Sequence, residues 1–213
     1  MERKIHNKGA SRLFKNNFLD RLARTSPTIT LCTYVPIIAL LLYWNFKNDY
    51  TTELHLIIPI YIAGIVSWTL MEYMVHRYLF HFKTDSPAIK KFLYVIHGIH
   101  HEYPRDVNRL FMPPLAGMIF ILVFFSLFYP FMGTTVFVFL PGFVNGYLLY
   151  SFNHYFMHTR KPPKLLKSWW VHHSMHHYKH EDKVFGVSSP FWDHVFSTLP
   201  PKKATEEAST NFQ

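Results

Sequence analysis

The sequence predicts an all-α integral membrane protein with about four transmembrane helices and a helical cap on one side of the membrane. The first observation is that the hydrophobic residues, 49% of the 213, fall in long runs. The second is that the 22 lysine and arginine residues lie almost entirely between those runs. A chain of this length normally forms one domain, so we expect a single membrane-embedded domain.

Four apolar runs are long enough, or nearly so, to cross a bilayer as helices, which takes about 20 residues. In chain order they are residues 29–44, 54–75, 115–132 and 134–152. Only Met132-Gly133-Thr134 joins the last two, which predicts a tight hairpin; a partial or oblique crossing stays open as the alternative. Pro141 and Gly142 predict a kink in the fourth run.

The distribution of basic residues predicts the orientation of the spans. Seven precede the first span, six lie between the second and third, eight follow the fourth, and Lys47 alone lies between the first and second. The positive-inside rule makes the basic segments cytoplasmic. Both termini, residues 76–114 and the tail after His154 are therefore expected in the cytoplasm. The membrane would be the inner membrane of a bacterium or the endoplasmic reticulum of a eukaryote.

Composition divides the chain into three segments. Residues 1–28 are basic and lack the apolar core of a cleaved signal peptide, which predicts a membrane-surface segment, with a disordered leader as the alternative. Residues 29–200 form the membrane-embedded domain, and residues 201–213 form a polar tail. The one cysteine, Cys32, excludes a disulfide framework and a cysteine-based zinc site.

Histidine is over-represented and clustered. The chain has 15 histidines, about three times the number that average usage would give. Four clusters lie on the predicted cytoplasmic side or at its membrane boundary. They are His76 and His81; His97, His100 and His101; His154 and His158; and His172, His173, His176 and His177.

The spacing within these clusters predicts a metal site. Residues three and four apart share one helix face, so the second and fourth clusters each present three imidazoles together, and the third presents a pair. His76 and His81 are five apart, which suits a change of winding where the helix leaves the membrane. Imidazole binds iron, zinc, copper or nickel, and two metals would need about eight to ten histidines. The cap is therefore expected to hold a histidine-rich di-metal site that ties the second and fourth spans together.

Some histidines have other interpretations. A loose metal-buffering tract is the general alternative for a histidine-rich loop. His6, His55 and His194 stand alone and are expected to be structural. His172 and His180 adjoin the fourth cluster, and spacing excludes neither of them from the site.

Four segments carry more detail than the histidines alone: EYMVHRYLFH (72–81), HGIHHEYPRDVNRLFMPP (97–114), YSFNHYFMH (150–158) and HHSMHHYKHEDKVFGVSSPFWDHVFSTL (172–199). They resemble the membrane fatty acid hydroxylase superfamily and are most similar to fatty acid 2-hydroxylases that act on the acyl chains of sphingolipids. The resemblance covers about residues 64–200, and the second segment is the most specific because it adds Pro-Arg-Asp and a double proline to the histidines. One departure is Ser151, where the family often has an aspartate.

The resemblance implies ten metal ligands, and its last motif selects His173 over His172. The ligands are His76, His81, His97, His100, His101, His154, His158, His173, His176 and His177. It also implies two iron ions, which zinc can replace in a purified sample, and O2 as co-substrate. One oxygen atom would enter an acyl chain at its 2 position, in a fatty acid or a ceramide of the lipid bilayer. No fused cytochrome b5 domain fits before the first span, so electrons are expected from a separate donor of the cytochrome b5 or ferredoxin type. No nucleic-acid partner is expected.

Three polar residues are candidates for orienting the ligands. Glu72 lies one helical turn before His76, inside a span where an unpaired carboxylate is costly, so we expect it to orient a ligand histidine. Asp106 and Asn153 are weaker candidates, with helix capping as the alternative for each.

Three other functions stay open. The same superfamily includes carotenoid and sterol hydroxylases and desaturases, although the segment 97–114 favours the acyl 2-hydroxylases. One alternative is a membrane metal transporter. Such a protein would place its ligands near the bilayer midplane, whereas these histidine clusters lie at the cytoplasmic ends of the predicted spans. A metal-dependent hydrolase would need a carboxylate base, for which Glu102 is available.

Overall fold

The computed structural model describes residues 5–9 and 12–200, and their regular structure is helical throughout, which confirms the predicted all-α fold. The predicted polar tail, residues 201–213, lies outside the described residues. The α-helices are α1 (Asn17–Leu22), α2 (Pro27–Lys47), α3 (Leu54–Met74), α4 (Pro87–Leu93), α5 (Ile99–Glu102), α6 (Pro114–Met132), α7 (Val136–Thr159), α8 (Lys167–Tyr178) and α9 (Phe191–Val195). Short π-helical or 3-10 turns join them: η1 (Val75–Phe80), η2 (Tyr94–Gly98), η3 (Val107–Arg109), η4 (Gly133–Thr135) and η5 (Lys164–Leu166).

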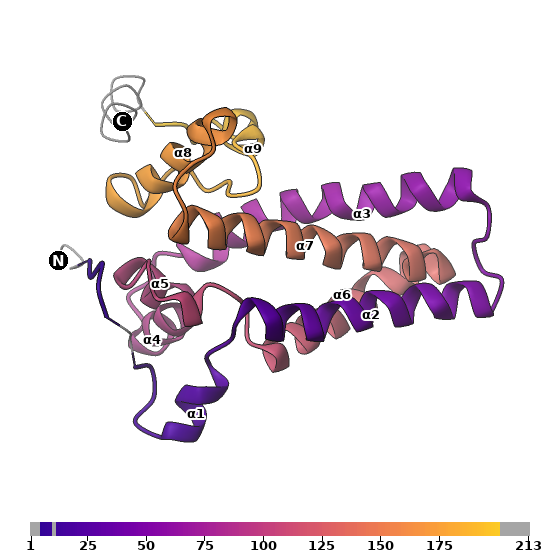
Figure 1. Cartoon of the computed structure of the whole chain (residues 1–213), viewed down its shortest axis with the longest axis horizontal. Coiled ribbons are helices and arrows are strands. Elements are labelled where there is room, and N and C mark those ends of the chain that lie inside the picture. Colours follow the sequence, from indigo (N-terminus) through magenta and orange to yellow (C-terminus); the bar gives the residue numbers. More distant parts are fainter. Residues whose placement is uncertain (1–4, 10–11, 201–213) are drawn as a thin grey trace.

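Three stretches of the described chain are long and apolar enough to cross a membrane, namely Pro27–Lys47, Leu54–Phe80 and Val107–Thr159. The third contains both α6 and α7, which η4 joins, so the described bundle is built from four long apolar helices (Figure 1). Gly133 has a φ of 55° in this turn, a conformation that glycine adopts at little cost. The predicted tight hairpin is confirmed.

Local sequence explains where the long helices begin. The Ser26 side chain accepts a hydrogen bond from the amide of Ile29 (3.3 Å) and caps α2, whose first residue is Pro27. Helix α6 likewise begins at a proline, Pro114. Proline suits the first helical position because its fixed φ is already helical and its missing amide would have no partner there.

Helix α7 is the centre of the bundle and packs mainly against α3 and then α2. Close approach of α3 and α7 depends on glycine, because a Cβ at Gly142 would overlap the Tyr61 carbonyl and one at Gly64 would overlap the Phe139 carbonyl. Small residues allow this backbone proximity between apolar helices. The helix continues through Pro141, and the kink expected there stays a prediction.

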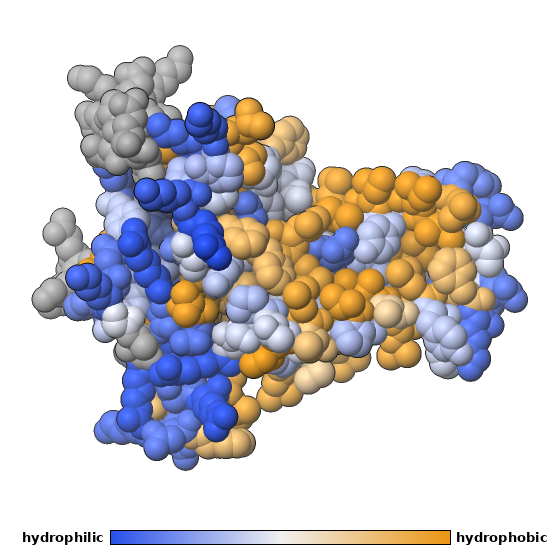
Figure 2. Space-filling model, in the orientation of Figure 1, coloured by the Kyte–Doolittle hydropathy of each residue, from blue (hydrophilic) through white to orange (hydrophobic). Residues whose placement is uncertain are grey.

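The outer surface of the bundle is apolar. Large side chains on α3 and α6, such as Ile62 and Leu122, are more than half exposed. Figure 2 shows a broad hydrophobic zone along the bundle, with hydrophilic residues gathered at its two ends. Such a surface suits contact with lipid rather than water.

The short helices α1, α4, α5, α8 and α9 form a cap at one end of the bundle, where the described chain also begins and ends (Figure 1). Helix α3 enters this cap through η1, which is π-helical, and the amide of His81 donates to the carbonyl of His76 across it (3.2 Å). A π-helix bonds residues five apart. The change of winding predicted from the five-residue spacing is therefore confirmed.

A buried aspartate attaches the N-terminal segment to the cap. Asp20 accepts hydrogen bonds from the amide of Leu13 (2.7 Å) and from Arg109 (2.8 Å), and it pairs with Arg24 (2.8 Å). Burial alone would raise the pKa of Asp20, but these donors lower it to about 2. The same attachment leaves Phe18 exposed on α1.

Candidate metal centre

The cap brings the ten predicted ligand histidines into two compact groups. Within each group, one nitrogen atom from every ring lies within 4.8 Å of those of the other four. Group one is His76, His81, His97, His101 and His176, and group two is His100, His154, His158, His173 and His177. In the described residues both groups consist of histidine alone.

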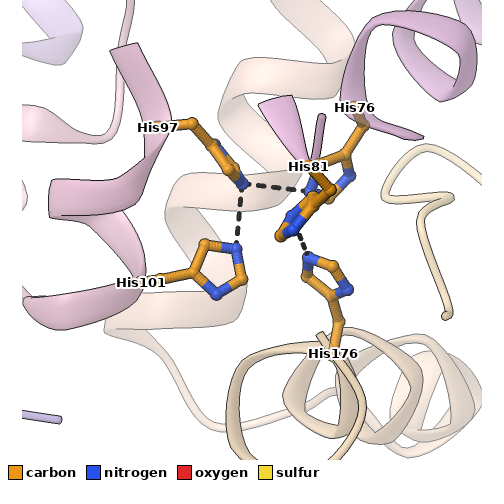
Figure 3. A group of neighbouring side chains, drawn as sticks. All are labelled: His76, His81, His97, His101 and His176. Carbon is orange, nitrogen blue, oxygen red and sulfur yellow. Dashed lines mark hydrogen bonds between the residues drawn. The ribbon is translucent and has the colours of Figure 1, made fainter. Parts of the chain in front are cut away.

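Group one gathers rings from four elements. His76 and His81 come from η1 and its end, His97 from η2, His101 from α5 and His176 from α8 (Figure 3). Their Nε2 atoms face one another: His97 lies 3.1 Å from His76 and 2.9 Å from His101. The Nε2 atoms of His81 and His176 are 3.0 Å apart.

Group two is arranged in the same way. Helix α7 supplies His154 and His158, helix α8 supplies His173 and His177, and α5 supplies His100. The Nε2 atom of His158 lies 2.8 Å from that of His173 and 3.1 Å from that of His154. The His154–His100 and His177–His173 distances are 2.9 and 3.1 Å.

The structure divides two clusters that the sequence had placed on single helix faces. On α5, His101 points into group one and His100 into group two; on α8, His176 belongs to group one and His173 to group two. Successive residues of an α-helix are rotated by about 100°, so neighbouring histidines diverge enough to reach separate positions. Helices α5 and α8 therefore lie between the two groups and serve both.

The nitrogen atoms fit a pair of metal ions. The Nδ1 atoms of His76 and His176 lie 2.6 and 2.7 Å from the backbone carbonyls of Phe185 and Lys183. A carbonyl only accepts, so each Nδ1 carries the proton, and a neutral ring then presents a lone pair at Nε2. Lone pairs that converge at about 3 Å repel unless a cation or a proton lies between them. A metal ion in each group would resolve this repulsion.

Burial keeps the imidazoles of the cap neutral. It lowers the pKa of His97, His101 and His177 well below the usual range, and neighbouring imidazoles lower it further. Burial and the nearby His81 lower the pKa of His176 to about 3. Neutral rings are the form that binds metal, so the set is ready to act as ligands near pH 7.

Glu72 does not occupy the place that we expected beside an imidazole. Its carboxylate accepts from the backbone amides of Val187 (2.7 Å) and Ser188 (3.1 Å), both in the loop that follows α8. The physical reason is that two amides satisfy a buried carboxylate that a single imidazole would leave partly unpaired. The same loop carries the Phe185 carbonyl that meets Nδ1 of His76.

Asp106 and Asn153, the two weaker candidates for orienting ligands, make different contacts. Asp106 is the N-cap of η3 and accepts from the amide of Asn108 (3.2 Å), which confirms the capping alternative for this residue. Asn153 donates from α7 to the carbonyl of Val187 (3.1 Å). Asn153 and Glu72 therefore hold the same residue of the loop from two different helices.

Sequence reasoning missed a second buried carboxylate. Asp193 accepts from His172 (2.9 Å), Phe185 (2.9 Å) and Gly186 (2.8 Å). Burial raises the pKa of Asp193, but the hydrogen bonds from His172 and Thr198 lower it below its usual range. His172 is thus engaged outside both groups. An aspartate between aromatic residues, in FWDH, was the one available sign that it is buried and paired.

The other histidines also lie outside both groups. His6 stacks on Tyr103 with ring centroids 5.0 Å apart. His55 is exposed at the opposite end of the bundle beside Glu53, and His194 is exposed on α9. His180 follows α8 and is part of neither group.

A cavity of about 670 Å³ opens beside group one. His81 and His97 line it, together with aromatic rings that include Phe80 and Tyr94 and with the basic residue Arg77. Glu102, the possible base of a hydrolase, instead accepts from the Tyr94 hydroxyl (2.9 Å). The cavity thus places open space directly against two histidines of group one.

The chain is similar to known proteins over most of its length. The family model for fatty acid hydroxylase matches residues 61–198. The chain is 35% identical over 205 residues to the dihydroceramide fatty acyl 2-hydroxylase FAH1 of Arabidopsis thaliana, covering 94% of this chain and 84% of that protein. It is 34% identical over 217 residues to the fatty acid 2-hydroxylase of Homo sapiens, covering 90% of this chain but 57% of that protein. A solved structure of full-length scs7p, in which only the hydroxylase domain is visible, is similar with a TM-score of 0.83 at 32% identity, covering 91% of this chain and 74% of that one.

Proposed function

Because the chain belongs to the fatty acid hydroxylase family, we propose that it is a membrane di-iron oxygenase that hydroxylates a fatty acyl chain at its 2 position. The substrate would be a fatty acid or the acyl group of a sphingolipid such as ceramide. The observation that carries the proposal is the pair of adjacent groups of five buried histidines whose Nε2 atoms converge.

The ten histidines of the two groups would hold the metal ions, one in each group. Iron bound there would supply the oxidising power that breaking an unactivated carbon–hydrogen bond requires, with O2 and two electrons as co-reactants. Zinc binds the same ligand types, so a purified sample can carry zinc instead. The protein contributes the positions of the imidazoles and their neutral state.

The cavity beside His81 and His97 would admit the acyl group. Position 2 is one carbon from the carbonyl, so the polar end of the substrate must lie close to the metal centre while the chain extends away from it. Phe80 and Phe82 offer apolar contact near the end of the span, and Arg77 adds a basic group to the lining of the same cavity. Closure of the cavity by substrate would exclude water from the reacting carbon.

The cap would lie in the cytoplasm with both termini, and the apolar bundle would lie in the bilayer. The basic segments at the cap end support this orientation through the positive-inside rule. Helix α1 would rest on the membrane surface, since Phe18 and Leu22 are exposed beside Arg21 and Arg24. Electrons would reach the centre from a cytochrome b5- or ferredoxin-type donor on the cytoplasmic side.

Lipid analysis under labelled oxygen tests the function. The chain is expressed in a host that lacks 2-hydroxy lipids, grown under 18O2, and its lipids are examined by mass spectrometry. We expect one labelled oxygen atom at the 2 position of acyl chains. His177→Ala should abolish the product, while the exposed His55→Ala should not. No labelled hydroxyl group on any acyl chain would reject the proposal.

A further inference from the structure

We propose that the two metal positions are unequal, and that group one holds its metal more tightly because a backbone strap, residues 183–188, fixes two of its ligands. The inference rests on the proposed di-metal function but goes beyond it. It concerns which ion stays bound when the other leaves.

The two groups differ in how their outer nitrogen atoms are held. In group one, the Nδ1 atoms of His76 and His176 meet the carbonyls of Phe185 and Lys183 at 2.6 and 2.7 Å. In group two, the buried Nδ1 atoms of His100, His173 and His177 have no hydrogen-bond partner among the described residues. In group one the same is true of His101, whose Nδ1 lies 3.9 Å from the Glu181 carboxylate.

The strap is itself fixed at successive residues. Asp193 accepts from the amides of Phe185 (2.9 Å) and Gly186 (2.8 Å). Glu72 accepts from the amide of Val187 (2.7 Å), and Asn153 donates to the carbonyl of the same residue (3.1 Å). Side chains from α3, α7 and α9 thus converge on one short segment, which leaves its carbonyls little freedom to move.

The backbone of the strap has an unfavourable conformation at Val184. It is fully buried and has a φ of 62°, a left-handed conformation that is a genuine outlier for a β-branched residue. It lies directly between Lys183 and Phe185, the two residues whose carbonyls hold ligands. Strain of this kind persists where the surroundings over-determine the backbone, as they do here.

Hydrogen bonds from the outer nitrogen of a ligand imidazole fix its tautomer and ring orientation and raise its basicity. Losing such a bond typically weakens metal binding by about 10- to 100-fold. Group one has two bonds of this kind to the strap, so we expect its metal to leave at least about 10-fold more slowly than the metal of group two.

Metal release from the full-length protein in detergent tests the inference. The chain is loaded with Zn²⁺ alone, transferred to excess EDTA, and its zinc content per chain is followed by elemental mass spectrometry. Two phases of one equivalent each are expected. His177→Ala, which damages group two, should retain only the slow phase, and His176→Ala, which damages group one, should retain only the fast phase.

Loosening the strap should affect one phase. We expect Asn153→Leu to accelerate the slow phase about 10-fold and to leave the fast phase unchanged. Asn145→Leu is the matched control, since Asn145 lies two turns away on α7 and interacts with Tyr61. The two histidine variants decide the matter even if Asn153→Leu does not fold.

The outcomes separate the inference from the function on which it rests. Release of both zinc ions in a single phase would overturn the inference, as would a slow phase that survives in His176→Ala. Acceleration of the fast phase alone by Asn153→Leu would also overturn it. A wild-type chain that binds no zinc would instead contradict the proposed metal centre.

Discussion

The Nδ1 atom of His76 lies 2.6 Å from the carbonyl oxygen of Phe185, although 109 residues separate the two in the chain. The bond joins the end of a long apolar helix to the loop after α8. Glu72, one turn before His76, holds the same loop through Val187 and Ser188. A membrane helix thus positions a histidine directly and also positions the backbone that orients it.

Removing the Glu72 carboxylate should therefore cost metal. Glu72→Gln retains one acceptor but sets an NH2 group against a backbone amide, and Glu72→Ala removes both acceptors. We expect about 10- to 100-fold weaker metal binding, with the larger effect in Glu72→Ala. Metal content per chain and product formation measure it. Glu53→Gln, at the exposed opposite end of the bundle, is the control. Full metal occupancy with normal turnover in Glu72→Ala would contradict this role.

The conformation of Val184 gives a second prediction. Glycine accepts a φ of 62° without strain, so Val184→Gly should keep both metal ions. Val184→Pro fixes φ near −65° and removes the amide that donates to the Thr198 carbonyl (2.9 Å), so it should lose the metal of group one. Metal content after purification compares the two variants. Equal retention by both would show that the strap geometry does not matter.

Neighbouring histidines on α8 should behave differently. We expect His173→Ala to lose one metal, because His173 belongs to group two. His172→Ala should keep both metal ions but lower the free energy of unfolding by about 1–3 kcal/mol, since the buried Asp193 loses a partner. Metal analysis and denaturant unfolding distinguish the two. The reverse pattern would mean that His172 is the ligand.

The sequence was informative wherever a property repeats at fixed spacing. Long apolar runs predicted the bundle, and the five-residue interval from His76 to His81 predicted the change of winding that η1 shows. The sequence could not show that His100 and His101 serve different groups, because that depends on the rotation of α5 relative to its neighbours. Nor could it reveal the Phe185 carbonyl, since every residue has one and only the fold decides where it points.

The contact between α3 and α7 should be sensitive to volume. A side chain at Gly142 would overlap the Tyr61 carbonyl, which belongs to the backbone and cannot turn aside. We expect Gly142→Leu to destabilise the fold by about 3 kcal/mol or more and to lose metal, because α7 carries His154 and His158 and α3 continues into η1, which carries His76. Ala116→Leu, on the exposed face of α6, is the control and should be tolerated. Thermal unfolding in detergent and metal content give the comparison.

The Asp20 attachment should depend on pH. Hydrogen bonds from the Leu13 amide and from arginine hold its pKa near 2 in the folded protein, below the value of 3.8 that it has when free. A carboxylate with a lowered pKa contributes stability above its unfolded pKa and loses that contribution as the pH falls through the folded value. We therefore expect faster hydrogen exchange at the Leu13 amide, beyond the change in intrinsic rate, as the pH is lowered from about 4 to about 2.

Asp20→Asn should show fast exchange at every pH, whereas Asp85→Asn, which alters an exposed carboxylate, should behave as wild type. If the Leu13 amide is equally protected from hydrogen exchange at pH 2 and pH 6, Asp20 does not hold the N-terminal segment.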